Sequence, residues 1–100
     1  MKKDDTLMTA LATIIDPELH IPITDLGLVY GAELKKDGTA DITITLTTIG
    51  CPLYDVIHDD IVAAVEKVKS VKEVKVELTF DPPWSVEMIS EEAKIELGLE

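Results

Sequence analysis

The order of apolar patterns along the chain predicts an α+β fold, with its elements arranged α-β-β-α-β-α around one small sheet. Three observations support this prediction. Several segments place apolar residues at helical spacing, others alternate apolar and polar residues as half-buried strands do, and all of them fall within 100 residues. That length fits one domain, so we expect residues 1–100 to form a single domain. Because each strand has one apolar face, two helices over one side of the sheet would bury that face economically.

The first helix is predicted over residues 5–15, where apolar residues recur at helical spacing. Asp5 or Thr6 is expected to cap its start. Pro17 disfavours a helical conformation for the preceding residue, so the helix should end near Ile15.

A β-hairpin is predicted next, because residues 28–34 and 42–47 both alternate and the Asp-Gly pair at 37–38 favours a tight turn. The clearest helix follows from Pro52, with an apolar stripe formed by Leu53, Ile57, Ile61, Ala64, Val65 and Val68. A third strand is predicted over residues 74–80 and should stop at the Asp-Pro-Pro-Trp segment, since proline does not continue a strand ladder. A short last helix is expected from its cap Ser90 to about Leu97, before Gly98.

The composition excludes several classes of protein. The net charge is −11, and the 9 basic residues are all lysine. Because phosphate recognition depends on Arg and Lys, neither a nucleic acid nor an anionic membrane surface is expected as a partner. A single cysteine excludes an internal disulfide, and no signal peptide or apolar span is evident, so a reducing cytoplasm is the expected compartment.

The single cysteine, Cys51, falls between the second predicted strand and the long helix. Pro52 is a natural first helical residue, which makes Cys51 the expected N-cap. Unpaired N–H groups and the helix dipole at that position stabilise a thiolate, and Gly50 lets the backbone turn tightly before it. A buried, inert thiol is the alternative, since free cysteine is commonly buried.

One cysteine does not fill the coordination shell of zinc or of an iron–sulfur cluster, which usually takes four protein ligands. His58 lies seven residues after Cys51, roughly 10 Å along a helix, and His20 is in a loop. A cluster on Cys51 would therefore need ligands from a second chain or a small thiol, and transient binding fits better than a permanent site. A nucleophilic thiol enzyme is the weakest hypothesis, because the sequence shows no recognised Cys–His arrangement.

Four ordered motifs, "IIDPEL", "DLGLVY", "LTTIGCPL" and "VELTFDPPWSVEMISEEAKIELG", resemble the iron–sulfur cluster assembly domain family, which includes SufT and PaaD-like proteins. The resemblance covers nearly the whole chain. It implies a two-layer α/β sandwich, for which we expect a small mixed sheet with helices on one face. It also implies a non-enzymatic accessory role in metal–sulfur cluster biosynthesis, in which iron–sulfur clusters are delivered to client proteins.

The resemblance implies a site at which Cys51 is a transient ligand for iron or an iron–sulfur cluster, with no group bound permanently. Thr47, Thr48, Asp16 and Glu18 are expected to gather with it. Alternatives remain open for the supporting residues. Asp16 before Pro17 is also typical of a turn, and the two threonines also suit the end of a strand.

Trp84 is the only tryptophan, and two roles are open for it. Such a residue usually anchors a loop to the core, but it can also form a contact surface for a partner. A second hypothesis for the whole chain is therefore an interaction adaptor that uses its acidic surface and residues 81–84. The expected partners are iron–sulfur client or assembly proteins, and a homodimer would be needed to bring two Cys51 thiolates together.

Overall fold

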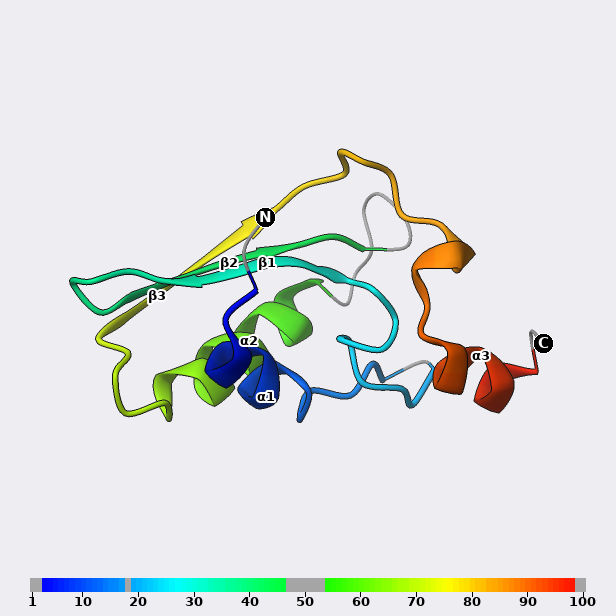
Figure 1. Cartoon of the computed structure of the whole chain (residues 1–100), viewed down its shortest axis with the longest axis horizontal. Coiled ribbons are helices and arrows are strands. Elements are labelled where there is room, and N and C mark those ends of the chain that lie inside the picture. The colour runs from blue at the N-terminus through cyan, green and yellow to red at the C-terminus, as the bar shows by residue number, and fades with distance from the viewer. Residues whose placement is uncertain (1–2, 18, 47–53, 99–100) are drawn as a thin grey trace.

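A computed structural model of the chain describes residues 3–17, 19–46 and 54–98 (Figure 1). Its elements are α1 (Asp5–Leu11), β1 (Val29–Leu34), β2 (Thr39–Ile44), α2 (Tyr54–Glu66), β3 (Glu73–Leu78), a 3₁₀ turn η1 (Val86–Met88) and α3 (Glu91–Leu97). The strand order is β1-β2-β3, with β1 antiparallel and β3 parallel to β2. The sheet is therefore mixed, and the predicted α+β class and order of elements are confirmed.

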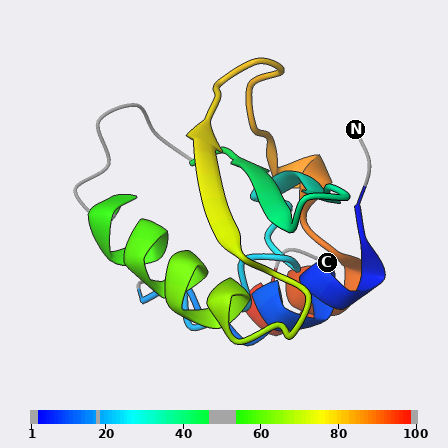
Figure 2. The same ribbon diagram turned by 90° about the vertical axis from the view of Figure 1, so that its left-hand side faces the viewer.

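The helices α1 and α2 lie side by side on one face of the sheet, as Figures 1 and 2 both show. The core fills the space between these two layers. Its fully buried large side chains are Leu7, Leu11, Ile23, Leu26, Ile42, Ile44, Ile57, Ile61 and Val65. The described part of the predicted α2 stripe is confirmed: three of its residues are in that group, and Ala64 and Val68 pack against it. None of the described helices combines the length and apolar character needed to cross a bilayer.

The first helix begins at Asp5, as predicted, but it is shorter than predicted and has a different cap. Asp4, rather than Asp5 or Thr6, is its cap, because its Oδ1 accepts the Leu7 N–H at 3.0 Å. The helix stops at Leu11. Thr13 bonds the Ala10 carbonyl oxygen through its hydroxyl at 2.7 Å and its N–H at 3.2 Å, and such local bonds replace the helical pattern.

The predicted hairpin is present, but its first strand does not alternate regularly. Val29 pairs with Ile44 and Gly31 with Thr43, so Tyr30 is the extra residue of a bulge. Both Val29 and Ala32 are therefore buried, and the Tyr30 hydroxyl reaches Pro82 on the face of the sheet away from α1 and α2. We call this face the outer face.

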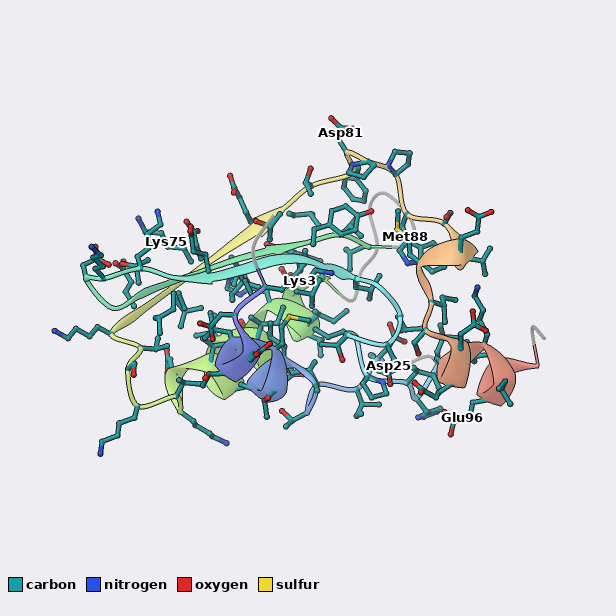
Figure 3. The ribbon with its side chains drawn as sticks, in the orientation of Figure 1. Lys3, Asp25, Lys75, Asp81, Met88 and Glu96 are labelled. Carbon is teal, nitrogen blue, oxygen red and sulfur yellow. The ribbon has the colours of Figure 1, made fainter. Side chains whose placement is uncertain are left out.

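Residues 79–90, here called the strap, arch over one end of the outer face before the chain descends into α3 (Figures 1 and 3). The strap begins with the Thr79 N–H bonded to the Ile44 carbonyl oxygen at 2.9 Å. It ends with the Ser90 N–H bonded to the Asp25 carbonyl oxygen at 2.7 Å. The cis peptide bond of this segment joins Asp81 to Pro82.

The last helix follows its prediction closely. Ser90 caps α3 by accepting the Ala93 N–H, and Gly98 ends the helix in a left-handed conformation. Ala93 is buried and Leu97 packs against the core, whereas Ile95 between them is 67% exposed. The α3 helix thus attaches to the domain by one narrow face.

Candidate functional site

Five of the seven predicted site residues, Glu18, Thr47, Thr48, Gly50 and Cys51, lie outside the residues that the structure describes. The structure does describe both ends of the connection that carries Cys51. The β2 strand ends at Ile44, Leu46 is the last described residue before the connection, and α2 begins at Tyr54. Because Leu46 and Ile57 are buried, both ends of this connection are fixed to the core.

Asp16 closes a compact turn after α1. Its N–H donates to the Ile21 carbonyl oxygen at 2.9 Å, and its own carbonyl oxygen accepts the His20 N–H at 2.8 Å. Its side chain, 9% exposed as a residue, accepts the Leu19 N–H at 2.9 Å. The turn also holds His20 at a φ of 60°. These bonds are those of a turn-forming aspartate, which is the structural alternative for Asp16.

Trp84 anchors the strap. Its indole N–H donates to the Leu26 carbonyl oxygen at 2.8 Å, and its half-buried ring packs against the core. The Tyr30 hydroxyl adds a second attachment by donating to the Pro82 carbonyl oxygen at 2.7 Å. Trp84 therefore has the anchoring role that is usual for a lone tryptophan, and its contacts with partners remain a prediction.

Thr45 is a feature that sequence reasoning missed. It is fully buried, and its Oγ1 has no hydrogen-bond partner in the described part of the chain. The alternation of β2 indicated only that Thr45 faces away from Ile44 and Leu46. That pattern is also typical of an exposed threonine, so no sequence signal marked its burial.

The resolved pKa shifts lie at the hairpin turn, at the other end of β2 from Thr45. The Thr39 N–H bonds the Asp37 carboxylate and lowers the pKa of Asp37. A hydrogen bond and salt bridge to Asp41, at 3.1 Å, raise the pKa of Lys35. Within residues 3–17, 19–46 and 54–98, no three His, Cys, Asp or Glu side chains gather closely enough to hold a metal ion.

The fold and the position of its cysteine define the class of protein. It is a small two-layer α+β domain whose only thiol lies in a strand-to-helix connection. A family model described as "Iron-sulfur cluster assembly protein" matches residues 4–78, so the chain belongs to that family.

Relatives and solved structures agree with this membership. The chain is 43% identical to the "Fe-S protein maturation auxiliary factor" of Porphyromonas gingivalis, over 98% of this chain and 93% of that protein. It is 40% identical to a crystal structure from Bacillus anthracis titled as a domain of unknown function, DUF59. That match has a TM-score of 0.90 and covers 96% of this chain and 92% of the other. The chain is also 40% identical to an "Iron-sulfur cluster carrier protein" from Deinococcus radiodurans. That match covers 74% of this chain but only 21% of the longer carrier protein.

Proposed function

We propose that this chain is an accessory factor that helps assemble iron–sulfur clusters or deliver them to client proteins. It binds iron or a cluster transiently, as cargo, through Cys51. Membership of the cluster assembly family is the observation that carries the proposal. The names of two relatives, a maturation auxiliary factor and a cluster carrier, support the accessory role and are not names of enzymes.

The composition supports transient rather than permanent binding. Cys51 is the only cysteine of the chain, whereas a cluster usually takes four protein ligands. The remaining ligands must come from outside the chain, from a second copy, a client protein or a small thiol. A cargo held partly by external ligands is released when those ligands change, which suits delivery. Asp16, Glu18, Thr47, Thr48 and Gly50 are proposed to support the thiol.

Anaerobic reconstitution with iron and sulfide tests the proposal, read by visible absorption and native mass. The wild-type protein should gain a cluster chromophore and the matching mass, whereas Cys51→Ala should gain neither while keeping its circular dichroism spectrum. The exposed residue Ser70 offers a control, because Ser70→Ala should load as the wild type does. In cells, Cys51→Ala should fail to support the activity of an iron–sulfur client. Normal client activity in that variant would reject the proposed role of Cys51.

An interaction adaptor is the second candidate, favoured by the exposed apolar residues of the strap. Val86 is 51% and Met88 is 36% exposed, and Glu87 lies between them. In this role Trp84 acts by holding the strap in place, so Trp84→Ala should abolish partner binding while Cys51→Ser retains it. Binding of an iron–sulfur client by these two variants, measured side by side, distinguishes the candidates.

A further inference from the structure

The β3 strand forms one edge of the sheet, and among the described residues no strand pairs with its side away from β2 (Figure 2). We call this side the open edge. The Thr79 N–H, just after the strand, bonds the Ile44 carbonyl oxygen of β2 at 2.9 Å. Because every second residue of a parallel strand bonds the same neighbour, the backbone N–H and C=O groups of Val74, Val76 and Leu78 point to the open edge. Such a row of backbone groups is a template for another strand.

The open edge also leaves apolar side chains incompletely covered. Each of Val74, Val76 and Leu78 lies beside a buried residue of β2, so these three side chains share the core face of the sheet. Yet Val74 and Val76 are only half-buried, and Leu78 is 37% exposed. The opposite edge of the sheet differs, because the Asp4 N–H donates to the Ala32 carbonyl oxygen of β1 at 2.7 Å. A further strand along β3 would remove apolar surface from water.

The charges of β3 alternate in sign along its other face. Glu73, Lys75 and Glu77 are all exposed, and Lys75 lies on the outer face (Figure 3). In an antiparallel pair of two β3 strands with its two-fold axis at Val76, Lys75 of each copy lies opposite Glu77 of the other. An axis at Lys75 would instead place Lys75 opposite Lys75 and Glu73 opposite Glu77. Since opposite charges across a strand pair stabilise it and like charges destabilise it, the charges favour the register centred on Val76.

The same register also matches the backbone and the apolar side chains. Val76 lies opposite Val76 of the second copy, and Val74 lies opposite Leu78, so apolar side chains meet on the core face. The backbone groups of these same residues point to the open edge, so each of these pairs has the groups needed to exchange both hydrogen bonds of an antiparallel ladder. One register therefore satisfies the charges, the apolar side chains and the backbone at once.

We propose that the open edge of β3 is a self-association surface, at which two copies of this chain form an antiparallel β3–β3 pair centred on Val76. The two sheets then join into one continuous sheet. The inference goes beyond the proposed function, because the pairing requires neither iron nor Cys51. Two six-residue strands form a small interface, and the net charge of −11 on each copy opposes association. The dimer is therefore weak and depends on protein concentration.

Sedimentation equilibrium of the metal-free protein over a range of concentrations tests the proposal, at a salt concentration that screens the net charge. The wild type should pass from monomer to dimer. Lys75→Glu and Glu77→Lys each place like charges opposite one another at two positions, so each should raise the dissociation constant about tenfold. An equal mixture of the two variants should associate again, because their heterodimer has opposite charges at both positions. A wild type that stays monomeric at every concentration would overturn the proposal.

Glu73→Lys is a matched control for Glu77→Lys. Both substitutions replace an exposed acid of β3 by lysine and bring the net charge closer to zero. General repulsion between acidic copies would therefore make both variants associate more strongly than the wild type. In the proposed register Glu73 lies opposite Thr79, so Glu73→Lys should not weaken the dimer, whereas Glu77→Lys should. If the two variants associate equally, the register is wrong and the proposal fails.

Amide hydrogen exchange locates the interface independently of charge. The N–H groups of Val74, Val76 and Leu78 should exchange more slowly as the wild-type concentration rises, whereas those of Lys75 and Glu77, which point to β2, should change little. Slower exchange that appears only after an iron–sulfur client is added would assign the open edge to a strand of the client and overturn self-association. Such a failure leaves the proposed function standing, because cluster loading of the wild type and Cys51→Ala tests that function separately.

Discussion

Gly27 is the residue on which the docking of the strap most directly depends, so Gly27→Ala is a sharp test of the fold. Gly27 has a φ of +75° and follows the turn that carries Asp25 and Leu26. A Cβ atom added there would lie 2.5 Å from the Met88 carbonyl oxygen and 2.8 Å from the Met88 Cβ. Both contacts are shorter than real Cβ atoms make, and one of them is with the backbone. Alanine therefore forces the turn and the strap apart.

Two separate costs set the expected loss in the free energy of unfolding of Gly27→Ala. A left-handed conformation costs a non-glycine residue about 1–2 kcal/mol. Forcing extra volume into a packed contact typically costs about 1–3 kcal/mol more. We therefore expect Gly27→Ala to lower the free energy of unfolding by about 2–5 kcal/mol, a large part of the roughly 5–15 kcal/mol of an ordinary domain.

Gly98 provides a matched control, because its φ is +76° and nothing lies within 4 Å of its added Cβ. Gly98→Ala should show only the conformational cost, about 1–2 kcal/mol at most. The difference between the two variants therefore measures the contact between Gly27 and Met88.

Urea unfolding followed by two probes is the appropriate assay. Circular dichroism reports the whole fold, and the fluorescence of Trp84, the only tryptophan, reports the strap. If the strap detaches in Gly27→Ala, the Trp84 emission shifts to the red before urea is added, while most of the dichroism remains. Equal stability losses in the two glycine variants, with unchanged Trp84 emission, would refute this account of the strap.

Three further predictions address the core, a helix cap and the effect of pH. Ile61→Ala, at a fully buried position of α2, should lower the free energy of unfolding by about 2–5 kcal/mol in a urea titration. Ser90→Ala removes the acceptor for the Ala93 N–H and should cost about 1 kcal/mol, measurable as faster amide exchange in α3. The lowered pKa of Asp37 means that its carboxylate stabilises the fold above its ordinary pKa and loses this effect as the pH falls through the lowered value. The stability deficit of Asp37→Ala should therefore be smaller at pH 2 than at pH 7, as thermal unfolding at both values would show.

The elements that local chemistry determines could be predicted from the sequence. The α3 helix has its cap, its first-turn acids and its terminal glycine where the sequence indicates them. The α2 stripe and the hairpin turn were predicted for the same reason, since periodicity and the Asp-Gly pair act over a few residues. The bulge at Tyr30 and the early end of α1 were not predicted. The bulge depends on pairing between strands, and the end of α1 depends on competition by the Thr13 hydroxyl.

The candidate site was predictable only in part. The sequence marked Cys51 because it is unique and sits between a strand and a helix pattern. It left the role of Asp16 open, and the structure gives that carboxylate the bonds of a turn former. Thr45 gave no signal at all. The bond from the Trp84 indole to the Leu26 carbonyl oxygen likewise joins segments 58 residues apart. Contacts between segments so distant in sequence leave no local pattern.

The family match ends at the residue before the strap begins, so it divides the chain into a matched region and the strap with α3. The matched region, residues 4–78, ends with the last residue of β3, and the strap begins at the next residue. The matched region contains Cys51, the helices α1 and α2, and all three strands of the sheet. The proposed ligand residue, Cys51, therefore belongs to the matched region and not to the strap. The strap adds a cover for the outer face, tied to that region by the bonds of Pro82, Trp84 and Ser90. Because those bonds join backbone oxygens or N–H groups and involve no charged pair, salt should hardly affect the attachment of the strap.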